Sequence, residues 1–332
     1  MRTLKNILLI AAVAMAVETS AQVKNYSPVN YGPKQYGNHY DPNNNAITQD
    51  SRGIMYFGTT NAVWQFDGQS WKRIEIKAGI SVSSILVSES CDTIFIGAQN
   101  EFGFLVSNGT NYDYISLYEA VKEIVFPFSD VWKIFNIDGK IYYQCYDYIF
   151  MYDGVNVHIY DPETVFHNSF CVDNQLLVRQ REIGLCALDS MKFKLIPGGE
   201  IFANIGIFGI EKIGNGKSLI ISYEDGSWIM DENGITRNNT TFDKALKSVG
   251  FNVTSCVMLN DTTLVLGSYD NGILVITTSG EVIMHKTTDN GLNENEIKKL
   301  FCDREKNIWF TSSKGITLLP NNDYISHFFQ DQ

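Results

Sequence analysis

Short apolar runs recur along this chain at a regular spacing. Seven triplets of large apolar residues share the pattern, and they span residues 55–57, 94–96, 141–143, 176–178, 219–221, 264–266 and 308–310. Their central residues recur about every 42 positions, and periods of about 40–50 residues mark propeller blades or pairs of helices. The chain is therefore predicted to be a repeat protein, with repeats centred near residues 56, 95, 142, 177, 220, 265 and 309.

The content of each repeat indicates strands. A polar turn such as 138–139 precedes each triplet, and another apolar stretch, such as 85–87, often precedes that turn. Two short apolar runs around a tight polar turn are typical of a β-hairpin. A third run follows the triplet, as at 62–66, and a more polar fourth run often comes next, as at 71–74 and 325–328. Each repeat therefore supplies four antiparallel strands.

The repeats predict an all-β fold, a seven-bladed β-propeller. The middle strands are apolar on both faces, as expected where stacked blades bury both faces of each sheet. A stack of helix pairs would need apolar spacings of three to four residues. That spacing is found only weakly, around 118–125 and 242–249, which we interpret as short helices between blades. The fourth and fifth repeats are the least regular, so six or eight blades remain alternatives.

The first residues have the features of an export signal. Arg2 and Lys5 precede an apolar run at 7–17, and the small residues 19–21 offer a cleavage site. This run is short for a bilayer span, which favours a signal peptide over residues 1–21. An uncleaved anchor is the alternative. We expect a periplasmic or extracellular protein with no membrane span in the mature chain.

The predicted organisation continues after the signal peptide. An extended segment at 22–44 precedes the propeller, which is expected to fill residues 45–328. The part of that segment at 23–40 is rich in Tyr, Gly and Asn, and it could add a strand that closes the ring.

Composition narrows the classes of function. The 332 residues are 44% hydrophobic and only 19% charged, with a formal net charge of −11 at pH 7. An acidic surface repels phosphate backbones, so we expect no nucleic-acid partner. The six cysteines include no CxxC pair. Export permits disulfides, but we interpret most of these cysteines as buried free thiols, with a disulfide as the alternative.

No motif for catalysis or for a cofactor stands out. The chain has no GxSxG elbow, phosphate-binding loop or dinucleotide fingerprint. Its histidines are not spaced like a metal pair on one strand or helix: His39, His158, His167, His285 and His327. We therefore predict a non-enzymatic protein without metal or cofactor. A lyase or glycosidase remains an alternative, because sequence alone cannot place two facing carboxylates in the centre of the ring.

The first, second and last repeats resemble a known repeat family. The segments that carry the resemblance are 47–59 and 63–68, 96–104, and then 291–293, 297–303, 307–311 and 314–316. They resemble the two-component regulator propeller repeat of periplasmic sensor regions in Bacteroidetes-type regulators. The stretch 96–104 is similar to the subgroup in which a triple-tyrosine domain, a membrane helix and a cytoplasmic effector follow. Because this chain stops at Gln332, signalling would need a partner or a further C-terminal module.

Several repeat residues have a structural explanation. Three glycines that follow the central strand are attributed to a crowded backbone or a positive φ: Gly58, Gly97 and Gly267. Three carboxylates next to tight turns are attributed to capping of local N–H groups: Asp50, Asp173 and Asp303. Trp309 occupies a repeat position and is expected in the core.

The candidate ligand-binding residues are polar or aromatic residues in loops after equivalent strands, or at a strand entry. They are Gln99, Asn100, Glu101, Asp130, Trp132, Arg179, Arg181, Tyr269, Asp270 and Asn271. Sugars bind by stacking on aromatic faces while polar groups fix their orientation. We therefore expect a sensing or binding propeller whose ligand is a small molecule, with an oligosaccharide suggested by the resemblance. A protein–protein scaffold, with a protein partner or a second copy of the chain, is the alternative.

Overall fold

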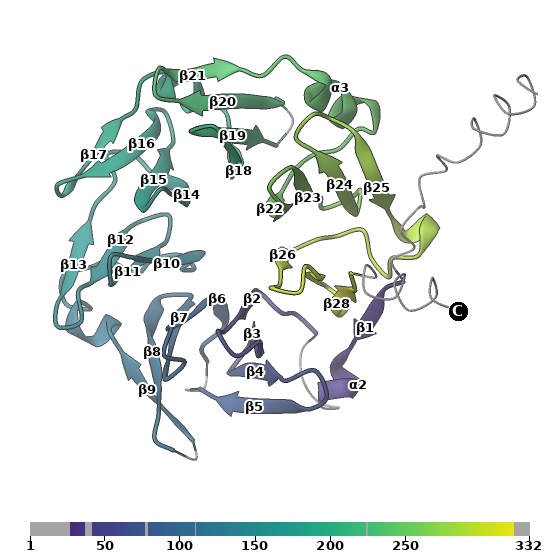
Figure 1. Cartoon of the computed structure of the whole chain (residues 1–332). Coiled ribbons are helices and arrows are strands. Elements are labelled where there is room, and N and C mark those ends of the chain that lie inside the picture. The colour runs from purple at the N-terminus through teal and green to yellow at the C-terminus, as the bar shows by residue number, and fades with distance from the viewer. Residues whose placement is uncertain (1–26, 37–41, 77–78, 110, 224, 322–332) are drawn as a thin grey trace, which may run out of the picture. The chain divides into compact units, whose positions relative to one another are not determined.

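The computed structural model describes residues 27–36, 42–76, 79–109, 111–223 and 225–321. The expected signal peptide at 1–21 and the expected strand at 325–328 lie outside them. Within the described part, the chain forms seven four-stranded antiparallel sheets that surround a common centre (Figure 1). The seven-bladed propeller is confirmed, and the alternatives of six and eight blades are wrong.

In each blade of the first half, the strands follow one another in chain order from the centre outward. Blade 1 contains β2 (Ala46–Gln49), β3 (Met55–Thr59), β4 (Ala62–Phe66) and β5 (Trp71–Glu75). Blade 2 contains β6 (Val82–Val87), β7 (Thr93–Ala98), β8 (Glu101–Ser107) and β9 (Tyr112–Ser116). Blade 3 contains β10 (Lys133–Ile137), β11 (Lys140–Gln144), β12 (Ile149–Tyr152) and β13 (Val157–Tyr160).

The same order holds in blades 4 to 6, whereas blade 7 combines both ends of the chain. Blade 4 contains β14 (Phe166–Val172), β15 (Gln175–Gln180), β16 (Gly184–Asp189) and β17 (Lys192–Leu195). Blade 5 contains β18 (Ile207–Gly214), β19 (Lys217–Ser222), β20 (Ser227–Asp231) and β21 (Gly234–Arg237). Blade 6 contains β22 (Ser255–Asn260), β23 (Thr263–Gly267), β24 (Ile273–Thr277) and β25 (Val282–Lys286). Blade 7 contains β26 (Lys299–Cys302), β27 (Ile308–Ser312), β28 (Gly315–Leu319) and β1 (Val29–Tyr31).

The N-terminal strand β1 closes the ring, as the sequence suggested. It pairs antiparallel with β28, with Tyr31 opposite Ile316. The fourth strand of blade 7 is therefore β1. The ring of Tyr31 lies 5.2 Å from that of Phe66 and 6.1 Å from that of Trp309, measured between centroids. The strand thus packs blade 7 against blade 1.

Aromatic side chains fill the spaces between blades. Between blades 7 and 1, the buried Trp309 packs with Phe57 at a centroid distance of 5.8 Å. Between blades 2 and 3, the rings of Phe102 and Phe150 stack at 4.4 Å. Such pairs contribute roughly 0.5–1.5 kcal/mol beyond the area that they bury. The core is therefore a ring of inter-blade layers, which explains why the middle strands are apolar on both faces.

The repeat glycines are needed for close packing of blades. A Cβ atom at Gly58 would lie 2.5 Å from Cγ1 of Val82, and one at Gly97 would lie 2.5 Å from Cγ1 of Val131. At Gly267 it would lie 2.8 Å from Cγ2 of Ile297. None of the three has a positive φ. The prediction of a crowded backbone is confirmed, and the alternative of a positive φ is wrong.

The turn carboxylates divide into two groups. Asp50 accepts hydrogen bonds from the Ile54 amide and the Tyr56 hydroxyl. Asp303 likewise accepts from the Asn307 amide and the indole of Trp309. Both confirm the capping role. Asp173 differs, because it takes a positive φ within its turn and pairs with Lys212 of the next blade.

The connections between blades contain the few helices of the described part. The expected helices appear as η1 (Tyr118–Ala120) and α3 (Thr241–Ser248), and the side chain of Thr240 caps the start of α3. The others are short: α2 (Pro33–Tyr36), η2 (Gly199–Phe202) and η3 (Thr288–Asn290). None of the helices in the described ranges is long and apolar enough to cross a membrane.

All six cysteines lie within the described residues, and all six are free thiols. Cys91, Cys145 and Cys186 are buried, in agreement with the expectation of buried free thiols. Cys171 is exposed and so does not follow this expectation for most of the cysteines. It lies near the end of the inner strand β14, next to the turn at Asp173, where the strand leaves the packed part of the blade.

Candidate ligand site

Antiparallel pairing defines two faces of the ring. The turns between second and third strands lie on the same face as the connections between blades, and we call it the loop face. An isolated bridge between Gln99 and Asp130 joins a turn of blade 2 to the connection that enters blade 3. All ten predicted ligand residues lie on or next to the loop face. Their contacts separate those that hold the fold together from those that remain available.

Three of the ten predicted residues hold the fold of the loop face. Glu101 is buried and accepts hydrogen bonds from the hydroxyls of Ser116 (2.8 Å) and Tyr114 (3.2 Å). Burial raises the pKa of the Tyr114 hydroxyl, and the charge of Glu101 raises it further. The side-chain oxygen of Asn100 accepts from the amide of Phe128, and the amide group of Asn271 donates to the carbonyl of Val249 at 2.9 Å. Ligand contact by these three stays a prediction.

Two further predicted residues are anchored but face the site. Arg179 stands where other blades have the repeat glycine, and its guanidinium donates to the carbonyls of Phe202 (2.8 Å) and Ala203 (2.7 Å). Burial lowers the pKa of Arg179, and the charge of Arg181 lowers it further. Asp130 accepts a hydrogen bond from the hydroxyl of Ser83.

Three of the five remaining predicted residues, Trp132, Arg181 and Tyr269, belong to a larger group, which we call the mouth cluster. Its members carry aromatic or cationic side chains on the loop face of blades 3 to 6. They are Trp132, Tyr146, His167, Arg181, Phe208, Tyr223 and Tyr269. Gln99 and Asp270 are exposed on the same face, and Asp270 accepts a hydrogen bond from the Ser268 hydroxyl at 2.8 Å.

Contacts between neighbours run through the mouth cluster. The centroid distance is 5.9 Å between Trp132 and Tyr146, and Cζ of Arg181 lies 5.9 Å from the ring centre of Tyr146. His167 and Phe208 are 5.6 Å apart, and Phe208 and Tyr223 are 5.9 Å apart.

Tyr269 of blade 6 extends the cluster. Its side chain is 56% exposed. Partial burial raises its pKa, and the nearby side chains of Glu296, Tyr146 and Tyr223 contribute further. Side chains from four blades therefore share one surface.

Two polar atoms of the mouth cluster have no protein partner. The indole nitrogen of Trp132 and Nδ1 of His167 are buried, and neither finds a hydrogen-bond partner among the described residues. A buried polar atom without a partner costs about 1–3 kcal/mol, and such atoms in a cleft are candidates for contact with a ligand or water. Neither atom forms a hydrogen bond with a described residue of its own blade.

Irregular strand pairing aims three residues at this surface. The inner strands of blades 2, 4 and 5 shift register at their loop-face ends, at Val82/Ser84, Phe166/Ser169 and Ile207/Gly209. The residues inside these bulges include Ser83, His167 and Phe208. A bulge leaves a residue unpaired and turns its side chain away from the regular alternation. This explains how inner-strand residues reach the mouth cluster.

Below the mouth cluster, the inner strands contribute three charged residues that we call the axial groups: Lys133, Glu211 and Lys299. The ammonium of Lys133 donates to the carbonyl of Ser169 at 2.8 Å and lies 4.3 Å from the ring centre of Phe170. The ammonium of Lys299 lies 5.7 Å from the ring centre of Trp132.

Burial shifts the pKa of each axial group in the direction that favours its uncharged form. It lowers the pKa of Lys133 to about 8, and the charge of Lys299 adds to this shift. It also lowers the pKa of Lys299 to about 8, against the charge of Asp130, and raises that of Glu211 to about 7, against the charge of Lys133.

A pocket of about 330 Å³ adjoins the mouth cluster on the loop face. It is lined by His167, Arg179, Arg181, Glu182, Ala203, Asn204 and Gly206. Burial lowers the pKa of His167 to about 4, and the charges of Arg179 and Arg181 contribute to the shift. This pocket therefore carries a positive potential in a chain that is acidic as a whole.

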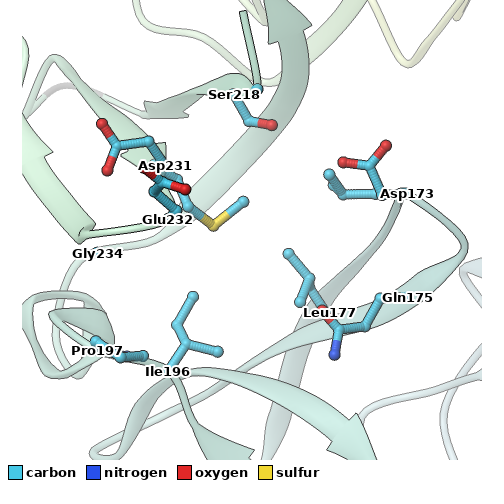
Figure 2. A pocket seen from close by; sticks show the side chains of 12 residues that line it. Asp173, Gln175, Leu177, Ile196, Pro197, Ser218, Asp231, Glu232 and Gly234 are labelled. Carbon is cyan, nitrogen blue, oxygen red and sulfur yellow. The ribbon is translucent and has the colours of Figure 1, made fainter.

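A second pocket, of about 260 Å³, lies between blades 4 and 5 and is separate from the mouth cluster. Figure 2 shows Asp173 across this pocket from Asp231 and Glu232, with Leu177 and Ile196 on its apolar side. Two of its carboxylates are already engaged, because Asp173 pairs with Lys212 and Asp231 accepts from the Asn233 amide. Within the described ranges, no group of three or more His, Cys, Asp or Glu residues could hold a metal ion.

Comparison with known proteins supports the fold. The extracellular domain of the hybrid two-component system BT3049 from B. thetaiotaomicron is similar, with a TM-score of 0.66 and 18% identity over 89% of this chain. The extracellular domain of the hybrid two-component system BT4673 from the same organism gives 0.68, with 17% identity over 90% of this chain. This chain covers only 42% and 40% of the lengths of those two chains.

An enzyme shares the same architecture. A streptogramin B lyase structure is similar over 90% of this chain and 99% of its own, with a TM-score of 0.65 and 15% identity. No family model and no curated protein matches the sequence. At these identities the likeness establishes the propeller fold, which it shares with extracellular domains of two-component systems.

Sequence reasoning missed several residues of the site. Tyr146 stands three positions after its triplet, as do Gln99, Arg181 and Tyr269, so alignment of the repeats by triplet could have found it. His167, Phe208 and the axial groups have no comparable signal. Their place depends on bulges and on which inner-strand face points to the centre, and only the assembled ring defines both.

Proposed function

We propose that this chain is an exported, non-enzymatic sensing propeller that binds an oligosaccharide at the mouth cluster. The observation that carries this proposal is the surface of aromatic rings from four blades beside two buried nitrogen atoms that have no hydrogen-bond partner among the described residues. Aromatic faces stack on the apolar faces of sugars, and a few polar groups fix their orientation. Signalling then requires a partner protein or a module outside this chain.

The similarity to extracellular domains of hybrid two-component systems supports this proposal at the level of the fold. The propeller provides a rigid support for the loop face. The side chains that contact the ligand are ones that the blades do not need for their own packing. Trp132 and Tyr146 form the stacking platform, while Arg181 and Tyr269 border it.

The test is binding to a panel of oligosaccharides, measured by calorimetry with the mature chain. Trp132→Ala and Tyr146→Ala should each weaken binding of the selected sugar by at least about tenfold, since stacking and buried contacts of this kind contribute more than about 1.4 kcal/mol. Trp71→Ala, an aromatic variant of the outer strand of blade 1, serves as the control. Equal loss in all three variants, or turnover of the bound sugar, would contradict the proposal.

A protein-binding scaffold is the second candidate, and one surface favours it. Ile124 and Phe126 lie in the connection between blades 2 and 3 with 73% and 81% of their side chains exposed. Exposed apolar side chains in one segment often mark a contact with another protein. Phe126→Ser should abolish capture of a protein partner if the scaffold hypothesis holds, and should leave sugar binding unchanged if the sensing proposal holds.

A further inference from the structure

The pocket beside the mouth cluster contains two cationic side chains of blade 4, and the connection to blade 5 completes its wall. Arg179 and Arg181 both line it, and His167 forms part of its wall. The charge of Lys133 also reaches His167. Glu182 is the acidic residue that lines the same pocket. The chain as a whole has a net charge of −11, so the two arginines of this pocket contrast with the overall acidity of the protein.

Polar groups in this pocket are held in place by the fold but do not form all the hydrogen bonds that they could. Arg179 is buried, and its Nε and Nη2 atoms donate to two carbonyls, which leaves Nη1 without a partner among the described residues. Nδ1 of His167 is buried and also unpartnered there. Arg181 is exposed, and its Cζ lies 5.9 Å from the ring centre of Tyr146. A guanidinium anchored by two hydrogen bonds beside an exposed one is well suited to hold an oxyanion through charge-assisted hydrogen bonds.

We propose that this pocket binds an acidic group of the ligand, a carboxylate or a sulfate ester, so that the sensed oligosaccharide is anionic. This inference rests on the proposed function, because it assumes that the sugar rings stack on the mouth cluster. Arg181 joins the two parts of the site, since it lines the pocket and contacts Tyr146. A sugar on Tyr146 would therefore place its acidic substituent beside Arg181 and Arg179.

The pocket also determines the protonation state of His167. Burial and then the charges of Arg179, Arg181 and Lys133 lower the pKa of His167 to about 4, so the imidazole is neutral at physiological pH. An oxyanion in the pocket would offset these charges and stabilise the protonated ring. Binding of an anion should therefore raise the midpoint at which His167 titrates and should be coupled to proton uptake below about pH 6.5.

The first experiment uses inorganic sulfate as the probe and chloride at equal ionic strength as the reference. The imidazole signal of His167, followed by NMR, should shift with sulfate in a saturable manner, and its titration midpoint should rise. Arg181→Gln should weaken the sulfate effect by about tenfold, whereas Lys72→Gln on the outer strand of blade 1 should leave it unchanged. Absence of a sulfate effect in the wild-type chain would overturn the inference.

The second experiment compares three trisaccharides of equal length: trigalacturonate, a sulfated galactotriose and neutral galactotriose. We expect at least one acidic trisaccharide to bind at least tenfold more tightly than the neutral one, and Arg181→Gln to remove that preference. The preferred acidic sugar identifies the group. Because Arg179 supports the fold, His167→Asn provides the second variant, and it should reduce the preference without unfolding the blade.

The outcomes separate the two proposals. Equal binding of all three sugars, lost in Trp132→Ala but not in Arg181→Gln, would retain the proposed function and overturn the anionic pocket. A sulfate effect that depends on Arg181, without binding of any sugar through Trp132, would retain the pocket and overturn the sugar platform. An Arg181→Gln variant that keeps the full preference for acidic sugars would also overturn the pocket.

Discussion

Blades 7 and 4 start from the same repeat and use it differently. In blade 7, Asp303 accepts hydrogen bonds from Asn307 and Trp309 of its own hairpin. In blade 4, Asp173 pairs instead with Lys212 of the next blade. The turn carboxylate of blade 7 is therefore used within its own hairpin, whereas that of blade 4 pairs with the neighbouring blade.

The blades also differ in the residue that follows the central triplet. Blades 1, 2 and 6 have a glycine after the central triplet, and the next blade packs directly onto it. Blade 4 has Arg179 there, and its guanidinium supports the connection to blade 5 beside an open pocket. Blades 3 to 5 lack this glycine, with Gln144, Arg179 and Ser222 in its place, and they provide most of the mouth cluster. The proposed site therefore lies where the repeat departs from this glycine pattern.

The largest expected effect is the difference in stability between variants of Trp309, which lies in the core of blade 7, and of Trp132, which belongs to the mouth cluster. Trp309→Ala should lower the free energy of unfolding by about 3–5 kcal/mol, since it removes a buried aromatic side chain. Trp132→Ala should lower it by less than about 1 kcal/mol, because Trp132 is half-buried and its indole N–H bonds to no described residue. Urea denaturation of both variants measures the difference, and similar losses would mean that Trp132 is a core residue.

The turn carboxylates give the next comparison. Asp303→Asn should cost about 1.5–3 kcal/mol, because it weakens hydrogen bonds to a buried carboxylate. Asp173→Asn should cost about 0–1 kcal/mol, because its pair with Lys212 is exposed. Thermal unfolding of the two variants side by side provides the measurement. If Asp173→Asn proves the more damaging, blade 4 depends on its turn as much as blade 7 does.

The axial groups predict how stability depends on pH. Burial raises the pKa of Glu211 to about 7, so the folded chain binds more protons than the unfolded chain between about pH 4.5 and 7. The contribution of this carboxyl to stability is present below pH 4.5 and is lost as pH rises through 7. Glu211→Gln should flatten the stability profile across that window. Parallel profiles for both proteins, measured by denaturation at a series of pH values, would contradict the assignment.

Asp50 provides a control with the opposite sign. Although burial alone would raise its pKa, hydrogen bonds from Arg52, Tyr56 and the local backbone lower it overall. Its contribution to stability is therefore present above about pH 4 and is lost as pH falls through the lowered value. Asp50→Asn should reduce the loss of stability in acid and leave the window of Glu211 unchanged.

The smallest expected effect concerns the thiols. Since all six cysteines are free, a reductant should not change the melting temperature. Under native conditions, a thiol reagent should modify Cys171 of blade 4 first, because it is exposed, and should modify Cys186 only on unfolding. A melting temperature that falls with reductant would reveal a disulfide and contradict the structure.

Much of the fold was predictable because it is local and periodic. The apolar triplets and their turns determine the hairpins, and seven similar hairpin pairs can bury both faces only by stacking on one another. The glycines at 58, 97 and 267 and the carboxylates of Asp50 and Asp303 were interpreted correctly, because their roles are settled within one repeat or by the next.

The candidate site was predictable only in part. Loop position indicated Trp132, Arg181 and Tyr269, which the structure brings to one surface. It also indicated Glu101, Asn100 and Asn271, whose side chains form hydrogen bonds that support the loop face. Sequence position alone could not separate these two groups, because the difference lies in partners such as Ser116 and Phe128, from other strands and connections.

The sequence by itself determined the repeat, the glycines that allow blades to approach, and a loop face with aromatic residues. The tertiary structure decided that the blades number seven, that β1 completes blade 7, that bulges turn His167 and Phe208 towards the mouth cluster, and that Lys133 comes within electrostatic reach of Glu211 and Lys299. The physical reason is that hairpins form from neighbouring residues. The mouth cluster and the axial groups exist only when seven sheets, each built on its own, close into a ring and bring distant side chains within reach.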